Sequence, residues 1–489
     1  MKRSRRSAPH SVALVSILIA LCSCGGGGGG EGGAEPVTVS TLAYVVTECR
    51  GDAEALTIRQ SLQIRQGEQV PITVVEHSAV VPGAGFYCAA VGLVRQGPYF
   101  AELGVFRRLG VTPDGSQVVF EVTDEVTQGV VYPLVFPANA LPAEEKGIFA
   151  VHADGTGLRR LGPASRVGSF FLSLFTFSPN GRTIAYTDRG PGRDHQDAVQ
   201  IFTLDLVTAD RTDRRQITQL PPASGIFGGT YQPFFNDDHR ITFSTHADAD
   251  GNHPDGGNIV VTVNTDGTGL KVAPPVIALP GSELLTSFRI TGSDLDAAVL
   301  TLPGTPVNPG VGTSSSFNIL EVFDIDRDNN VLQLTNFRRV DTLTPTVSGD
   351  RQRVFFTASA DPLGTNPTEN CQMFSVDRTS NDLRQVTDFH EVSEGQRSKA
   401  GCSFYQRPLG CGAFFTTRDT RSDAVVFYSS CDPFGTNTNG SQIFAMRSDG
   451  TGLRQLTNMR GYTSDASGAV TVELPFPFAW PGYQLRNQL

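Results

Sequence analysis

Acidic residues alternate with small residues in the stretch THADADGNHPDGGN at 245–258. Oxygen atoms are the ligands that Ca²⁺ takes in proteins, and alternating carboxylates on one loop can converge on such an ion. Here the converging side chains would be Asp248, Asp250 and Asp255. Asp, Asn and Gly are also ordinary turn formers, and turn formation accounts for the same composition. We therefore expect no metal and no other cofactor, and calcium at this loop is the less favoured interpretation.

A second acidic stretch, DIDRDNN at 324–330, has similar spacing but lacks two parts of a calcium loop. No Gly stands at its sixth position, and Thr335 occupies the twelfth, where a standard loop has Glu. A plain hairpin turn is the favoured interpretation.

Four of the eight histidines, His195, His239, His246 and His253, lie within a short part of the chain. In some lyases that act on uronic-acid oligosaccharides, histidines from neighbouring structural repeats form a metal site. No HExxH spacing is present, however, and no GxSxG marks a nucleophile. We expect no catalytic residue, with a carbohydrate-active, lyase-type enzyme as the alternative.

The N-terminus indicates export. A basic MKRSRRSAPH precedes an apolar stretch, 11–21, that has the length of a signal-peptide core. Leu21-Cys22-Ser23-Cys24 resembles a bacterial lipobox, in which a small residue precedes the cysteine that is lipidated. We assign 1–23 to a lipoprotein signal peptide, Cys24 to lipidation and 24–36 to a flexible Gly-rich tether. The alternative is an ordinary secretory peptide.

Six cysteines remain once Cys22 and Cys24 are set aside: Cys49, Cys88, Cys371, Cys402, Cys411 and Cys431. An even number in an oxidising compartment predicts disulfides. Cys49 and Cys88 could form one of them, and the connectivity of the other four stays open. The sequence contains no CxxC with zinc spacing.

The net charge excludes one class of partner. The formal charge is −10, and it becomes −14 when the four basic residues of the leader are removed. An acidic body argues against nucleic acid as a partner. The partners we expect are a membrane, bound through the N-terminal lipid, and an unidentified protein or peptide of the cell envelope.

The elements that carry these residues are repeated. DGTGL occurs three times, at 154–158, 266–270 and 449–453. Successive copies begin 112 and 183 residues apart. Apolar alternation, an Asp, Gly or Asn turn and a second short strand predict a hairpin at each copy and at degenerate copies between them. These hairpins span 148–162, 201–218, 259–273, 319–335, 373–387 and 443–457.

Another hairpin precedes each of these, at 111–122, 177–188, 235–245, 291–302, 347–358 and 417–430. Two hairpins give four strands for each repeat. A four-stranded antiparallel unit repeated six times or more is typical of a β-propeller, in which each blade packs against its neighbours. The sequence therefore predicts an all-β fold, with DGTG as a structural turn.

FSPNGRTIAYTD followed by IFxxxxDGTGLRQLT resembles the repeat of the TolB-type β-propellers. The resemblance covers about 104–460. It implies a protein of the periplasm or the cell surface, on the outer membrane. Fold alone does not fix the function.

The ends of the chain supply the remaining strands. TLAYVVTE at 41–48 and the residues to 76 match the second, third and fourth strands of the repeat, and FPFAWPG near the C-terminus matches the first. We favour one propeller over 37–489, with seven blades and a shared closing blade made of 41–76 and 470–482. The alternative is a six-bladed ring with 36–100 as a separate β domain.

Strand alternation divides the loops between two faces. Turns between first and second strands, and between third and fourth, lie on one face and are short. Loops between second and third strands, and connections between blades, lie on the other face and vary in length. Irregular loops on a rigid scaffold usually carry binding residues. This second face, the loop-rich face, is the predicted recognition surface of a scaffold that binds a protein or peptide.

The lipobox assignment predicts a difference between two neighbouring cysteines. Cys24→Ala should release the protein from the membrane fraction, because the acylated residue is lost, while Cys22→Ala should leave it bound. Fractionation followed by immunoblotting measures this. Equal retention of the two variants would contradict the assignment.

Overall fold

The computed structural model describes residues 37–481 with gaps. The gaps are 52–54, 83–104, 125–140, 168–174, 194, 208–213, 224–232, 253–258, 273–296, 304–319, 327–330, 338–342, 349–351, 368, 390–411, 423, 430 and 437–439. The leader, the tether and Cys24 therefore lie outside the described residues. The described strands all belong to one compact unit, Pro36–Leu489.

Five sheets have four strands each, taken in sequence order and paired antiparallel. They are β4 (Phe106–Val111), β5 (Gln117–Val122), β6 (Gly147–His152) and β7 (Arg159–Gly162); β8 (Thr176–Phe177), β9 (Thr183–Pro191), β10 (Asp197–Asp205) and β11 (Arg215–Gln216); β12 (Phe234–Asp237), β13 (Arg240–Thr245), β14 (Ile259–Asn264) and β15 (Lys271–Val272); β19 (Leu343–Val347), β20 (Arg353–Ala358), β21 (Gln372–Asp377) and β22 (Leu383–Gln385); β23 (Phe414–Arg418), β24 (Ala424–Ser429), β25 (Gln442–Arg447) and β26 (Arg454–Gln455).

Two further sheets differ in strand number. One has three described strands, β16 (Ala297–Pro303), β17 (Leu320–Asp326) and β18 (Val331–Gln333). The other has five, in the order β27 (Gly461–Ser464), β28 (Val470–Ala479), β1 (Thr41–Gly51), β2 (Ala55–Gln66) and β3 (Ile72–Pro82). A short 3-10 helix, Ala143–Glu145, precedes β6.

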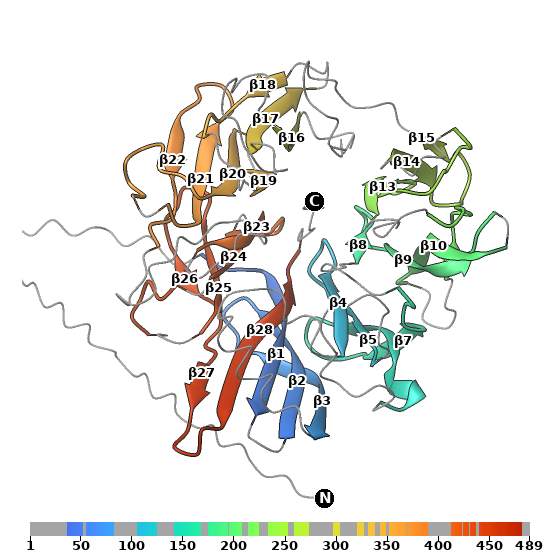
Figure 1. Ribbon diagram of the computed structural model, residues 1–489, viewed down its shortest axis with the longest axis horizontal. Coiled ribbons are helices and arrows are strands. Elements are labelled where there is room, and N and C mark those ends of the chain that lie inside the picture. The colour runs from blue at the N-terminus through green and yellow to red at the C-terminus, as the bar shows by residue number, and fades with distance from the viewer. Residues whose placement is uncertain are drawn as a thin grey trace, which may run out of the picture. The chain divides into compact units, whose positions relative to one another are not determined.

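The sheets form a β-propeller. Neighbouring sheets are in contact: β28 contacts β4, β8 contacts β12, β16 contacts β19, and β19 contacts β23. Figure 1 shows the sheets following one another around a common centre in chain order. The all-β prediction is confirmed. The favoured count of seven four-stranded blades is not reached among the described residues, where six sheets have four strands or more.

The predicted hairpins fall on consecutive strand pairs wherever the chain is described. The DGTG turn at the end of β6 is typical of them. Asp154 accepts hydrogen bonds from the backbone N–H and the hydroxyl of Thr156, at 2.9 and 2.7 Å, and Gly155 has a φ of 83°. The Thr156 hydroxyl holds the pKa of Asp154 below its usual value. Asp266 and Asp449 repeat these bonds, so the turn is structural.

A buried glutamine on the third strand holds the chain segment that leaves the blade. The side-chain oxygen of Gln442 accepts the Thr457 hydroxyl at 2.8 Å and the Met459 N–H at 3.0 Å, and its amide donates to the Met459 carbonyl. Thr457 in turn accepts the N–H of Ile443. Each polar group of this buried side chain is therefore satisfied, which is the condition for placing an amide in a core.

The same arrangement occurs in two other blades and in altered form in a third. The equivalent pairs are Gln200 with Thr218 and Gln372 with Thr387, and Glu321 with Thr335. In these blades, this repeated glutamine–threonine clasp fixes the start of the connection that leaves the blade on the loop-rich face.

The five-stranded sheet joins the two ends of the chain. β28 pairs antiparallel with β1 from Ala43 opposite Ala479 to Gly51 opposite Val470, with a register shift between Tyr44 and Val46. β27 pairs with the other edge of β28, a hairpin beyond the blade strands that the sequence assigns. The sheet lies between the sheets of β4–β7 and β23–β26, because β28 contacts β4 and β25.

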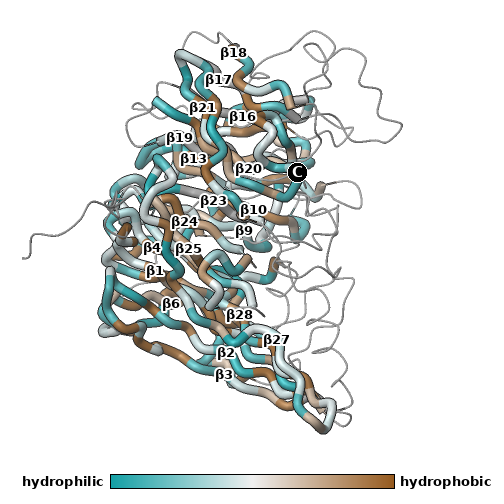
Figure 2. Tube along the Cα trace, turned by 90° about the vertical axis from the view of Figure 1, so that its left-hand side faces the viewer, coloured by the Kyte–Doolittle hydropathy of each residue, from teal (hydrophilic) through white to brown (hydrophobic). Residues whose placement is uncertain are grey.

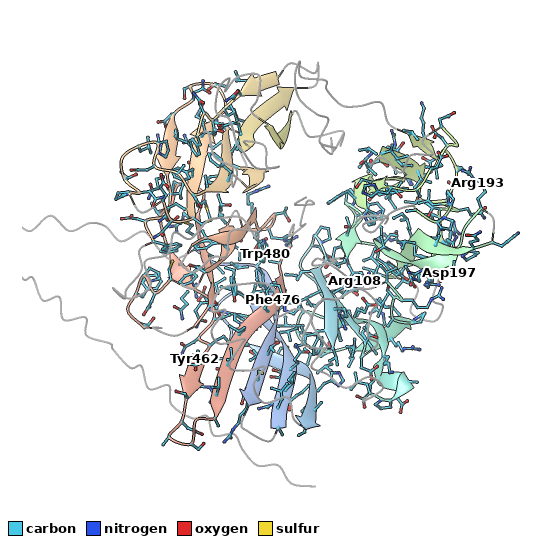
Figure 3. The ribbon with its side chains drawn as sticks, viewed as in Figure 1. Arg108, Arg193, Asp197, Tyr462, Phe476 and Trp480 are labelled. Atoms are coloured by element: carbon cyan, nitrogen blue, oxygen red, sulfur yellow. The ribbon has the colours of Figure 1, made fainter. Side chains whose placement is uncertain are left out.

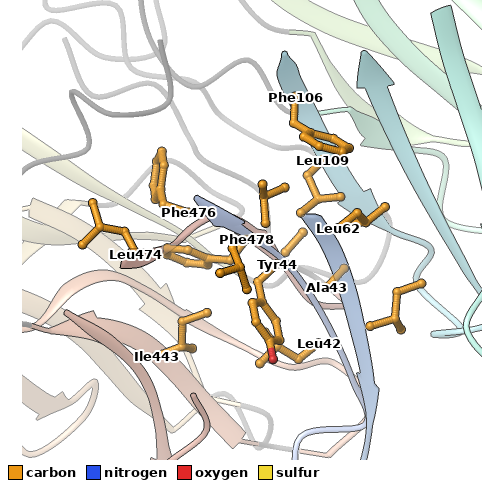
Figure 4. Packing of buried hydrophobic residues seen from close by; sticks show 14 of the residues in the cluster. Leu42, Ala43, Tyr44, Leu62, Phe106, Leu109, Ile443, Leu474, Phe476 and Phe478 are labelled. Carbon is orange, nitrogen blue, oxygen red and sulfur yellow. The ribbon is translucent and has the colours of Figure 1, made fainter. Parts of the chain in front are cut away.

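Phe476 and Phe478 of β28 pack among the buried hydrophobic side chains of this sheet and its neighbours (Figure 4). Phe478 stacks on Tyr428 of β24 at 5.7 Å between ring centroids, and Trp480 stacks on Phe478 at 5.5 Å. Trp480 is fully buried. One hydrophobic cluster therefore includes side chains from β28, β1, β4 and β24.

Polar contacts bind the same sheet to its two neighbours. Arg454 of β26 forms a salt bridge with Glu68, and Arg65 donates to the Leu456 carbonyl at 2.7 Å. On the other side, the Thr41 hydroxyl donates to the Gly115 carbonyl at 2.9 Å. Figure 2 shows hydrophobic and hydrophilic residues interspersed along β2 and β3 at the lower end of the molecule, whereas β1 is buried along almost its whole length.

Candidate functional site

The loop-rich face brings together loops of neighbouring blades. Arg193, in the loop between β9 and β10, donates a hydrogen bond of 2.6 Å to the Ala249 carbonyl in the loop between β13 and β14. Figure 3 places Arg193 and Asp197 at the periphery of this pair of sheets. The other face is formed by short turns in most blades, as predicted. The connection 206–214, between β10 and β11, is the longer exception.

Two loops of this face have nearly the same sequence, and each is capped by an aspartate. SADPLGTN and SCDPFGTN follow β20 and β24, the second strands of neighbouring sheets. The corresponding aspartate caps each turn, although at positions that differ by one residue: Asp361 accepts the backbone N–H of Asn366, five residues on, and Asp432 accepts that of Thr436, four residues on, at 2.7 and 2.8 Å. In each loop the glycine has a positive φ, 72° at Gly364 and 65° at Gly435.

These turns hold an apolar side chain in solvent at the same position. Leu363 is 45% exposed and Phe434 is 47% exposed, and the two are the corresponding residues of the two loops. The Phe434 ring lies 6.4 Å from that of Phe444. We call these two residues the paired apolar tips.

A buried ion pair lies beneath the loop-rich face. Arg108 of β4 and Glu121 of β5 are 2.7 Å apart, and their side chains are 1% and 2% exposed. Arg108 also donates to the Thr187 carbonyl on β9 of the next sheet, at 3.2 Å. Glu121 accepts the backbone N–H of Ser165, in the connection between the two sheets. Figure 3 shows Arg108 at the junction of these sheets.

A second ion pair continues this cluster within the next sheet. Asp188 pairs with Arg214 and accepts the backbone N–H of Arg166 at 2.6 Å. The Arg214 guanidinium lies 3.9 Å above the Phe202 ring, within the range of a cation–π contact, and donates to the Tyr186 hydroxyl. The cluster thus ties the connection at 165–166 to both sheets.

Burial dominates the electrostatics of the cluster. It raises the pKa of Glu121 above its usual value, and the Arg108 guanidinium opposes that shift. It also raises the pKa of Tyr186 to about 12. Arg108, Glu121 and Asp188 are almost completely buried, so they cannot touch a ligand at the surface. Their role is to position the loop-rich face.

The loop for which calcium was the less favoured interpretation is only partly within the described residues. Asp248 and Asp250 accept backbone N–H groups of their own turn, from Gly251 at 2.8 Å and Asn252 at 3.0 Å, whereas Asp255 lies in a gap. Within the described ranges, no group of three or more His, Cys, Asp or Glu side chains is arranged to hold a metal ion. β17 ends at Asp326, and the rest of 324–330 is not described.

Of the three described histidines in this group, His239 lies on the other face from His195 and His246. His195 lies between β9 and β10 with a φ of 60°, and His246 follows β13. His239 lies in the short turn between β12 and β13, where its N–H donates to Asp237. His253 lies outside the described residues.

Three of the candidate cysteines are disulfide-bonded: Cys49, Cys371 and Cys431. Cys49 lies at the end of β1, Cys371 just before β21 and Cys431 just after β24, all beside loops between second and third strands. Cys88, Cys402 and Cys411 are outside the described residues, so the pairing of Cys49 with Cys88 stays a prediction. In the part of the chain that is described, no helix is long and apolar enough to cross a membrane.

Sequence reasoning missed the buried ion pairs and the clasp. Arg107-Arg108 in an otherwise apolar strand was the available signal for the ion pair, because a buried strand tolerates arginine only with a partner. The signal for the clasp was a glutamine on the apolar third strand with a Thr 15 residues later, as in Gln372 with Thr387 and Gln442 with Thr457, or 18 residues later, as in Gln200 with Thr218. The exposure of the paired apolar tips had no sequence signal beyond the loop repetition.

No protein-family model and no curated protein matches the chain. Among solved structures, the β-propeller domain of the Trilobed protease from Pyrococcus furiosus is 12% identical with a TM-score of 0.41, over 74% of this chain and 88% of that one. Pyrococcus horikoshii acylaminoacyl peptidase is 9% identical with a TM-score of 0.42, over 85% and 52%. A prolyl endopeptidase is 10% identical with a TM-score of 0.44, over 88% and 55%. The chain thus spans about half the length of the two latter proteins.

The ion pair beneath the face predicts a non-additive loss of stability. Arg108→Met should lower the free energy of unfolding by about 3–5 kcal/mol, because it leaves a buried carboxylate without its cation. Glu121→Leu should do the same, and the double variant should lose clearly less than the sum of the two. Urea denaturation measures all three.

The exposed pair of Arg166 and Asp197, with side chains 57% and 51% exposed, is the matched control. Asp197→Ala should change the free energy of unfolding by less than about 1 kcal/mol. Single variants at Arg108 and Glu121 that are as stable as this control, or strictly additive, would contradict the structural role of the buried pair.

Proposed function

We propose that the protein is an exported, lipid-anchored β-propeller of the TolB type, which binds a protein or peptide through its loop-rich face. The observation that carries the proposal is the paired apolar tips. A leucine and a phenylalanine are held in solvent at the same position of corresponding loops on two neighbouring sheets. A partner would remove this apolar surface from water.

The turn geometry supports binding over chance exposure. Each loop is fixed by an aspartate that accepts a backbone N–H and by a glycine with positive φ. A tip that is already ordered loses little conformational entropy when a partner covers it. Disulfide-bonded Cys371 and Cys431 lie beside the same two loops, which further restricts their motion.

Seven blades are part of the proposal. The three described strands β16–β18 correspond to the second, third and fourth strands of a repeat, since β16 contacts β19 as β20 contacts β23. The first strand that the predicted hairpin at 291–302 would supply lies outside the described residues. The shared closing sheet supplies the seventh blade.

The binding test compares variants at the tips. Peptides selected from a random display library on the wild-type protein should be rich in apolar residues. The double variant Leu363→Ser, Phe434→Ser should bind them at least about tenfold more weakly, because the tips form the centre of the contact. Fluorescence anisotropy with labelled peptides measures the affinity.

Leu332→Ser is the matched control, because Leu332 is 46% exposed on β18. It should leave the affinity unchanged. Unaltered binding by the double variant would contradict the proposal. So would a protein that selects no peptide and cleaves uronic-acid oligosaccharides in a metal-dependent reaction, as the enzyme alternative requires.

A further inference from the structure

The outer strand of the closing sheet is unlike the outer strand of any other described blade. β3 spans 11 residues, whereas β7, β11, β15, β18, β22 and β26 have between 2 and 4. It is the terminal strand of its sheet, so no other described strand pairs with its outer edge. A short outer strand protects the edge of a sheet, and β3 lacks this protection.

The side chains of β3 do not protect its edge either. Its sequence, ITVVEHSAVVP, contains no Lys, and its proline stands at the last position. Its single acidic residue, Glu76, is 2.7 Å from Arg59 of β2. Val80 is 60% exposed and Ile72 is 37% exposed. Outside the strand ladders, the hydrogen bonds found among described residues include none from the β3 backbone.

An edge of this kind is a template for another β-strand. We propose that β3 pairs antiparallel with β3 of a second copy of this chain, so that the closing sheets of the two molecules form one continuous sheet. The contact is isologous, with the same strand contributed by each copy. A second copy always supplies an edge of the same length.

The side-chain pattern of β3 fits such a two-fold contact in one register. In a symmetric antiparallel pair, one central residue lies opposite the same residue of the second copy. Residues at equal distances before and after this centre lie opposite one another, with their side chains on the same face of the sheet. With His77 at the centre, Glu76 faces Ser78 of the other copy, and Val75 faces Ala79. Carboxylate then meets hydroxyl, and apolar meets apolar.

The two neighbouring registers are less favourable. With Glu76 at the centre, two carboxylates face one another, and like charges directly opposite destabilise a strand pair. With Ser78 at the centre, each Glu76 faces the apolar Val80.

His77 itself does not oppose the central register. Its imidazole is buried against Phe106, with 5.7 Å between ring centroids, and its Nδ1 is 3.3 Å from Glu145. Burial lowers the pKa of His77, so the two facing residues are neutral at neutral pH.

Sedimentation velocity of the full chain over a concentration series tests the pairing. The wild type should be a reversible dimer, and Val80→Lys should raise its dissociation constant at least about tenfold, because lysine on an edge strand blocks pairing. Val207→Lys is the matched control, since Val207 is 52% exposed and lies after β10, away from the edge. It should dimerise as the wild type does.

Substitutions of Ser78 test the register. In the proposed register, Ser78→Lys places a cation opposite the partner's Glu76 and should tighten the dimer, while Ser78→Glu places a carboxylate there and should weaken it about threefold or more. In the alternative register, where Ser78 lies opposite Ser78 of the second copy, both substitutions would weaken the dimer. Weakening by both would therefore overturn the proposed register. A monomeric wild type at every concentration would overturn the pairing, as would equal effects of Val80→Lys and Val207→Lys. Circular dichroism of each variant shows that the fold is retained.

Discussion

A ring of blades must be closed by pairing, because an open ring would leave two blade faces and a strand edge in water. Here the pairing of β28 with β1 provides the closure, since it places the last described strand of the chain beside the first. Phe478, stacked on Tyr428, and the buried Trp480 then connect the closing sheet to the sheet that precedes it. The remaining sheets follow one another around the centre in chain order between these two ends (Figure 1).

Buried polar groups turn this closed scaffold into a support for its loops. The glutamine–threonine clasps fix the segments that leave three blades, and the Arg108–Glu121 pair fixes the connection at Ser165. Buried polar groups rigidify a structure when all their partners are present. The loop-rich face is thus supported from below by interactions that cannot themselves reach a ligand, while Leu363 and Phe434 remain exposed above it.

The hairpins could be predicted because period-two alternation and Asp-Gly turns are local signals, and DGTG fixes its own geometry through Asp154 and Gly155. β27 could not, because GYTS has no apolar alternation and pairs only after β28 is in place. The Arg108–Glu121 pair depends on the register of two strands and on the next blade. The turn of Asp248 and Asp250 uses the same residue types as a cation site, and composition alone does not separate the two uses.

The most direct test of the closure is to remove β28 and return it as a separate peptide. A chain that ends after Asp465 lacks β28 and also the chain's one tryptophan, Trp480. Thermal unfolding of this chain should lose its cooperative transition, and a synthetic peptide of residues 466–489 should restore it, with a blue shift of the tryptophan emission as Trp480 becomes buried. A truncated chain that unfolds like the full-length protein, with no change on adding the peptide, would contradict the account.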